Sequence, residues 1–114
     1  MPTLYTRRFS FKDSLTDKEV LEEWRFIMDE AVPAVQKVRG SRSIKLYSRA
    51  GALRSDLTIA WEMDDAGVYE RALLSSDLRR MLGRLYGNWD LKTSTQSFRR
   101  EVTPELIHAL SSTG

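Results

Sequence analysis

The sequence predicts a single α+β domain whose elements follow in the order strand, helix, strand, strand, helix, strand. Two patterns predict it: apolar and polar residues alternate in several short segments, and apolar residues recur every three or four positions in the segments between them. The chain has 114 residues and no cysteine. This length is enough to bury one core without disulfide bonds.

The first strand is expected over residues 3–12. Alternation along it places a set of aromatic residues and one cation on the same face, namely Tyr5, Arg7, Phe9 and Phe11. The opposite face carries Leu4, Thr6, Arg8 and Ser10.

A helix is expected to begin at a capping box formed by Thr16 and Glu19. Apolar residues spaced three and four apart predict its buried face, namely Leu21, Trp24, Met28, Ala31 and Val35. Three further apolar residues widen this face, namely Val20, Ile27 and Val38. Pro33 should kink this helix or end it, because proline lacks the N–H that the helix needs. Gly40 fits a C-terminal stop.

Two further strands are expected at 43–49 and 56–63, joined by a turn at 50–52. In the later strand one face is apolar, with Leu57, Ile59, Trp61 and Met63, and the other carries Thr58, Ala60 and Glu62.

The rest of the chain predicts a second helical region and a fourth strand. Asp64 and Asp65 offer an N-cap, and the segment 75–77 should interrupt the helix and cap it again. The last strand is expected at 91–102 and a short helix at 104–110. Residues 111–114 are expected to be a loose tail.

This element order predicts a ferredoxin-like βαββαβ domain over residues 2–110, with an antiparallel sheet in the order 4-1-3-2 and both helices on one face. Such a sheet leaves its other face without a cover from the same chain. Because apolar and aromatic residues occur on both sides of the strands, we expect a second copy to cover it. Two sheets facing each other would form a dimeric α/β barrel.

Charge and composition exclude several classes of function. The 18 Lys and Arg against 16 Asp and Glu give a net charge of +2, too weak for a dedicated nucleic-acid binder. There is one histidine, and no GxGxxG or P-loop pattern. We therefore expect no metal, no cofactor, no nucleic acid and no membrane span, and we expect a cytoplasmic protein because no signal peptide is visible.

Three short motifs carry a resemblance to a known family. They are RRFSFK at 7–12, DLTIAWEMD at 56–64 and YERAL at 69–73. Together they resemble the NIPSNAP-like branch of the dimeric α+β barrel proteins, which are related to the antibiotic-biosynthesis monooxygenase-like and EthD-like domains. Members often carry a histidine two positions before the strand tryptophan, where this chain has Ile59.

The resemblance implies a dimer with a small-molecule pocket, either between sheet and helices or within the barrel. Some members of the superfamily are cofactor-independent oxygenases, isomerases or haem-degrading enzymes. The departure at Ile59 removes the residue that would act there as a proton relay or haem ligand.

Arg7 and Glu62 are the candidate catalytic residues. Arg7 would hold an acidic group through a bidentate contact, or it would form an ion pair across the dimer with Glu62 or Asp56. Glu62 would be a general base if it lines a dry lumen, or it is a paired strand residue. The candidate substrate-binding residues are aromatic, namely Tyr5, Phe9, Tyr47 and Trp61; each is otherwise a core or interface residue.

Two functions remain open from the sequence. In the first, the protein binds a small hydrophobic or aromatic molecule and acts as a cofactor-independent oxygenase or isomerase, or binds it without turnover. In the second, a non-catalytic dimer binds an acidic partner through a helix face with Arg79, Arg80 and Arg84. His108 would be a proton shuttle if the terminal helix folds over the barrel mouth, and is otherwise a surface residue.

Overall fold

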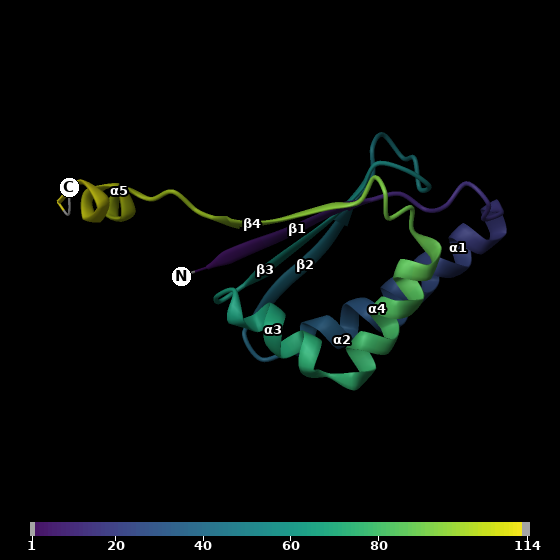
Figure 1. Cartoon of the computed structure of the whole chain (residues 1–114), viewed down its shortest axis with the longest axis horizontal. Helices are drawn as coiled ribbons and strands as arrows, with labels where there is room; N and C mark the ends of the chain where they lie inside the picture. The colour runs from purple at the N-terminus through teal and green to yellow at the C-terminus, as the bar shows by residue number, and fades with distance from the viewer. Residues whose placement is uncertain (1, 113–114) are drawn as a thin grey trace.

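The computed structural model describes residues 2–112, and it confirms the ferredoxin-like α+β fold. The elements in chain order are β1 (Thr3–Phe9), α1 (Asp17–Phe26), the π-helix η1 (Ile27–Ala31), α2 (Val32–Gln36), β2 (Ser41–Tyr47), β3 (Leu57–Met63), α3 (Gly67–Leu74), α4 (Ser76–Asn88), β4 (Thr95–Arg100) and α5 (Pro104–Ser112). The strands form an antiparallel sheet in the predicted order β2-β3-β1-β4. Helices α1 to α4 lie on one side of this sheet (Figure 1).

The register of β1 decides which residues face the helices. Tyr5 lies opposite Trp61 on β3 and Phe98 on β4, so these residues share one face. Since successive side chains alternate, Arg7 also faces the helices and Arg8 points to the open side. The predicted sidedness of this strand is thus confirmed, although β1 ends at Phe9 rather than at residue 12.

The first helix begins at the predicted capping box. The Glu19 backbone N–H donates to Thr16 Oγ1 at 3.1 Å, and the Thr16 N–H donates to Glu19 Oε1 at 2.9 Å. Leu21 and Met28, expected in the core, are 48% and 49% exposed, which corrects the predicted buried face. Val20 and Ile27, expected to widen this face, are buried together with Ala31, and so is Glu23, which was not expected there.

A π-helical turn separates α1 from α2, directly before Pro33. In η1 the Val32 N–H bonds to the Ile27 carbonyl, five residues back. A proline ring presses on the carbonyl four residues before it and offers no N–H. The wider turn relieves this conflict, so Pro33 neither ends the helical path nor breaks it sharply.

The hairpin between β2 and β3 closes at the predicted turn. Ala50 and Gly51 both have positive φ, 47° and 83°, and Arg49 pairs with Ala52. Positive φ at both central residues is the geometry of a type I′ turn, which matches the twist of hairpin strands.

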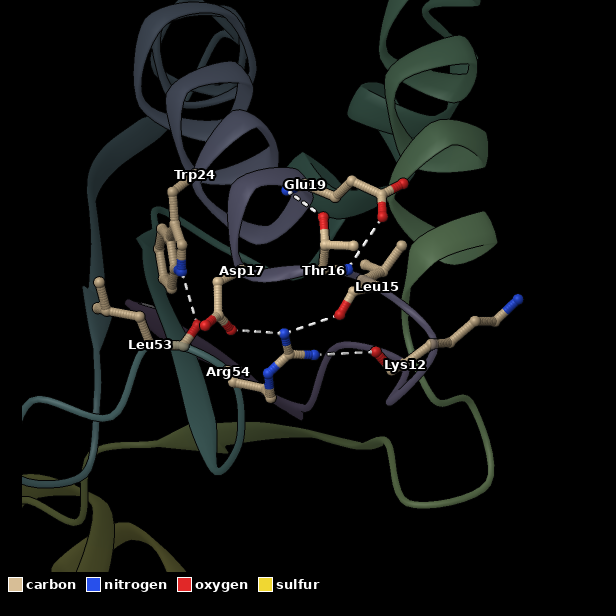
Figure 2. A network of polar contacts seen from close by, with 8 residues as sticks. All are labelled: Lys12, Leu15, Thr16, Asp17, Glu19, Trp24, Leu53 and Arg54. Atoms are coloured by element: carbon tan, nitrogen blue, oxygen red, sulfur yellow. Dashed lines mark hydrogen bonds and ion pairs between the residues drawn. The ribbon is translucent and has the colours of Figure 1, made fainter.

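Arg54 attaches this hairpin to the start of α1 (Figure 2). Its guanidinium donates to the carbonyl of Lys12 at 3.3 Å and to that of Leu15 at 2.8 Å, and it pairs with Asp17 at 2.9 Å. Trp24 adds a further link, because its indole N–H donates to the Leu53 carbonyl at 2.7 Å. The loop before β3 is therefore held against the helix layer.

Helix α4 starts where the sequence predicts a second cap, with Ser75 Oγ accepting from the Leu78 N–H. The predicted cap of α3 differs slightly: Asp65 accepts from the Gly67 N–H, but the helix itself begins at Gly67 after Ala66. The apolar core lies between the helices and the sheet. It includes Phe9 stacked on Trp89, with 4.1 Å between the two ring centroids.

The chain ends in an arm outside this two-layer body. β4 is shorter than predicted and leads to α5, which lies beyond the ends of the strands and away from the other helices (Figure 1). The radius of gyration of 16.2 Å accordingly exceeds the about 13 Å of a compact chain of this length. Residues 111–112 are helical rather than loose, and 113–114 lie outside the described residues. None of the helices in residues 2–112 has both the length and the apolar character needed to cross a membrane.

Candidate functional site

A cavity of about 130 Å³ lies between the sheet and the helix layer. Its sheet side is formed by residues of β1, β2 and β3, namely Tyr5, Arg7, Ile44, Leu46, Ile59 and Trp61. Its helix side is formed mainly by α2 and α4, with Val32, Val35, Leu78, Met81, Leu82, Leu85 and Tyr86. Among the described residues that line it, the charged one is Arg7. Mainly apolar walls with a few polar groups, here one arginine and several tyrosines, are typical of a small-molecule site.

Arg7 is fixed at the edge of this cavity by three hydrogen bonds. Its Nε donates to Ser94 Oγ at 2.8 Å, and its Nη1 donates to Tyr86 Oη at 3.1 Å and to Gln96 Oε1 at 3.0 Å. The guanidinium carbon also lies 5.0 Å from the Tyr86 ring centroid and 5.7 Å from that of Trp89, in cation–π range. These three hydrogen bonds, together with the Tyr5 hydroxyl nearby, hold the guanidinium in one position.

The electrostatics keep Arg7 charged and Tyr5 neutral. Desolvation lowers the pKa of Arg7, but its interactions with the Tyr5 and Tyr86 hydroxyls outweigh this and raise the pKa above its ordinary value. Burial raises the pKa of Tyr5 to about 12. The Tyr5 hydroxyl therefore stays protonated at neutral pH, and it donates to Gln96 Oε1 at 2.9 Å.

The structure brings some of the predicted site residues together and separates others. Tyr5, Arg7 and Trp61 line the same cavity. Phe9 lies in the core, 1% exposed, where it stacks on Trp89. It supports the cavity without forming its wall.

Tyr47 and Glu62 lie on the other face of the sheet. β2 pairs Tyr47 with Thr58, and β3 pairs Glu62 with Leu4, so both side chains point away from the helices. Glu62 Oε1 lies 3.8 Å from Arg42 Nη1, and about half of each side chain in this ion pair is exposed. The structure therefore does not bring Glu62 and Arg7 to one site within a chain.

The other expected partner of Arg7 is also engaged elsewhere. Asp56 pairs with Arg8 at 2.8 Å and with Arg49 at 3.5 Å. Within its own chain Arg7 is held by hydroxyl and amide contacts from α4, β4 and the segment before β4.

Sequence reasoning did not identify Tyr86, Ser94 or Gln96 as site residues. The signal for Gln96 was present in the last strand, because β4 places it opposite Arg7. Tyr86 and Ser94 reach Arg7 only through the tertiary packing of α4 and of the connection to β4, which no local pattern reveals.

A half-buried ion pair joins α1 to α4. Glu23 is 5% exposed, and its Oε2 accepts from Arg84 Nε at 3.1 Å and Nη2 at 2.8 Å. Arg84 also stacks on Phe26, with 3.9 Å from its Cζ to the ring centroid. Glu23 Oε1 is buried without a hydrogen-bond partner among the described residues.

The predicted arginine cluster of α4 is divided among different contacts. Arg84 is bound to Glu23, and Arg80 lies 3.5 Å from Asp77 on the same helix. His108 lies on α5, outside the body that holds the cavity (Figure 1), so the terminal helix does not fold over this site in its own chain.

The chain matches no family model and no curated protein. It is similar to SnoaB, a cofactor-independent oxygenase from Streptomyces nogalater, with a TM-score of 0.68 and 13% identity over 90% of this chain and 97% of that one. It is also similar to a dimeric protein of unknown function and ferredoxin-like fold from Bacteroides fragilis, with a TM-score of 0.70 and 14% identity over 88% and 96% of the two chains. A structure described as an antibiotic biosynthesis monooxygenase has a TM-score of 0.68 and 14% identity over 90% and 100%. At this low identity the similarity shows the fold alone: the chain has a ferredoxin-like α+β fold similar to that of the antibiotic biosynthesis monooxygenase-like proteins.

Proposed function

We propose that this protein binds a small, mainly apolar aromatic molecule in the cavity between sheet and helices. The observation that carries the proposal is the position of Arg7, a charged side chain held at the edge of a largely apolar cavity. An aromatic ring would pack against Trp61 and the α4 side chains, and an oxygen on that ring would bind the guanidinium. A phenol or an enol has this combination of an apolar body and a weakly acidic oxygen.

The same geometry favours chemistry through the substrate anion. In an apolar cavity, a fixed guanidinium stabilises negative charge on a phenolate or enolate far more than water-exposed arginine would. An electron-rich anion of this kind can transfer one electron to molecular oxygen. The resulting radical and superoxide then form a C–O bond, and the peroxide anion takes up the proton that the substrate lost, so that no cofactor is needed. We therefore infer cofactor-independent oxygenation as the reaction, with Arg7 holding the anion; the fold similarity to SnoaB supports this.

We propose further that the active form is a homodimer closed over the open face of the sheet. Structures with the same fold from Bacteroides fragilis and Thermobifida fusca are described as dimeric. Tyr47 and Glu62 would then line the interface or lumen between the two sheets, rather than the cavity that holds Arg7. The narrower placement in the NIPSNAP-like branch is likewise a proposal, and it rests on the three motifs of the sequence.

The alternative function, an acidic partner bound by the arginines of α4, loses support from the contacts of that helix. Arg84 is held by the buried Glu23, which leaves Arg79 and Arg80 for such a partner. Two exposed arginines, one of them near Asp77, provide a much weaker anion-binding surface than the sequence suggested.

A fluorescence titration tests the proposed binding. Trp61 and Trp89 line the cavity, so 4-nitrophenol bound there should quench tryptophan emission. Arg7→Met should weaken binding at least tenfold, whereas Arg8→Met, its neighbour on the open side of the same strand, should leave it unchanged. Oxygen uptake by the protein with a panel of phenols and enols, without added cofactor, then tests for turnover. Absence of binding by the whole panel, or equal effects of the two substitutions, would contradict the proposal.

A further inference from the structure

We propose that the first half of α4 is a lid, and that the ligand enters the cavity between α2 and α4 past Leu78 and Met81. This inference rests on the proposed function, since it describes how the same cavity is filled.

The first observation is that the cavity and a surface groove have two lining residues in common. A groove of about 530 Å³ lies on the surface between η1, α2 and the start of α4, and Leu78 and Met81 line both this groove and the cavity that holds Arg7. These two side chains therefore separate the cavity from solvent on this side. Methionine is unbranched and flexible, which suits a side chain that must move aside.

The second observation is the placement of glycine in α4. Gly83 and Gly87 lie inside the helix, and a Cβ at either position would meet nothing within 4 Å. Packing therefore does not require glycine at either place. A glycine in a helix interior weakens the helix locally, so α4 is easier to open than its packing alone would suggest.

The third observation is that the two halves of α4 are anchored differently. After Gly83 come Arg84, bound to the buried Glu23, and Trp89, which is 1% exposed. Before it, the helix is separated from α3 by the extended Ser75, with φ −76° and ψ 121°. Gly83 thus lies between a first half that packs on the core through the partly buried Leu78 and Met81 and a second half held by Arg84 and by the buried Leu85. Local opening of a segment is common in folded proteins.

The two glycines provide a matched pair for the test. Gly83→Ala should stabilise the moving half of the helix and slow both the entry and the release of 4-nitrophenol. Stopped-flow tryptophan fluorescence measures both rates. Each should fall about fivefold, because a glycine inside a helix costs about 1 kcal/mol relative to alanine. Because opening affects entry and release alike, the equilibrium Kd should not change. Gly87→Ala, in the anchored half, should raise thermal stability similarly and leave both rates unchanged.

Met81→Ala should accelerate entry, because it removes part of the wall between groove and cavity. The lid proposal would be overturned if the two glycine substitutions changed the entry and release rates equally. It would also be overturned if the protein bound the probe but neither Gly83→Ala nor Met81→Ala changed these rates. A protein that does not bind the probe at all would instead overturn the proposed function.

Hydrogen exchange tests the lid without a ligand. Amides at 79–83 should exchange faster than those at 85–88, and Gly83→Ala should reduce that difference. Uniform protection along α4 would contradict the lid whatever the outcome of the binding experiments.

Discussion

The guanidinium of Arg7 lies over the ring of Tyr86 and also donates to its hydroxyl, with 5.0 Å from Cζ to the ring centroid and 3.1 Å from Nη1 to Oη. One tyrosine of α4 therefore fixes the position of the charged group at the cavity by two different contacts. This relationship joins the helix layer to β1 at the point where the proposed ligand would bind.

Tyr86→Phe should separate these two contacts. The ring remains to stack on Arg7, but the hydrogen bond is lost, so the free energy of unfolding should fall by about 1 kcal/mol. Affinity for 4-nitrophenol should fall less than in Arg7→Met, since the guanidinium is still present but less firmly oriented. Urea denaturation and the fluorescence titration measure the two effects, and a loss of affinity as large as that of Arg7→Met would contradict the positioning role.

Arg84→Met should destabilise the protein because it leaves the Glu23 carboxylate buried without its partner. We expect a loss of about 2 kcal/mol, below that of a fully buried pair, because the Arg84 side chain is 48% exposed. Arg80→Met is the matched control. Both side chains of the Arg80–Asp77 ion pair are exposed, so this pair should contribute little to the free energy of unfolding. Urea denaturation that shows equal losses for the two variants would contradict the structural importance of the Glu23 pair.

Thr16→Ala should cost about 1 kcal/mol, the usual value for a helix N-cap. It should also change an acid titration. The backbone and side-chain hydrogen bonds of Thr16 hold the pKa of Glu19 below its ordinary value of 4.5. A lowered folded-state pKa means that this stabilisation is present above pH 4.5 and is lost as the pH falls through the folded-state value. NMR titration should therefore find a low midpoint for the Glu19 carboxyl in the wild type. In Thr16→Ala the midpoint should rise only in part, because alanine keeps the backbone N–H that is the larger cause of the shift. A wild-type midpoint at or above 4.5 would contradict the contact.

Ala60→Arg should convert the proposed dimer into a monomer. Ala60 lies on the open face of the central strand β3, between Thr6 and Lys45, where a long cation would keep a second sheet away. The wild type should have twice the chain mass of 13.2 kDa in sedimentation equilibrium, and the variant should have the mass of one chain with an unchanged circular dichroism spectrum. Glu22→Arg, an exposed change on α1, should leave the dimer intact, and a monomeric wild type would contradict the proposed assembly.

Local signals predicted the elements of this fold well. The capping box at Thr16 and the alternation of β1 depend on residues close in sequence, and both are confirmed. The buried face of the first helix was wrong for Leu21 because a charged residue, Glu23, lies in the true buried stripe. Its burial depends on Arg84, which is 61 residues away in the chain, so no helical period could reveal it.

The candidate site was predicted in part for a similar reason. Strand alternation already placed Arg7 with Tyr5, and the structure confirms that they share a face. Within one chain Arg7 and Glu62 do not meet, because β1 pairs Arg7 with Ile59 and turns it to the helices, whereas Glu62 lies on the open face. The partners that fix Arg7 come from α4 and from residues 94–96, whose packing only the three-dimensional structure shows.

The absorbance of bound 4-nitrophenol as a function of pH tests the central role of Arg7 most directly. Its phenol and phenolate forms absorb at different wavelengths, so the spectrum reports its ionisation inside the cavity. An apolar cavity alone raises the pKa of a phenol, whereas an adjacent guanidinium lowers it. We expect the bound probe to ionise at lower pH than the free probe, and Arg7→Met to reverse the shift; a bound probe that ionises at higher pH in the wild type would contradict the account.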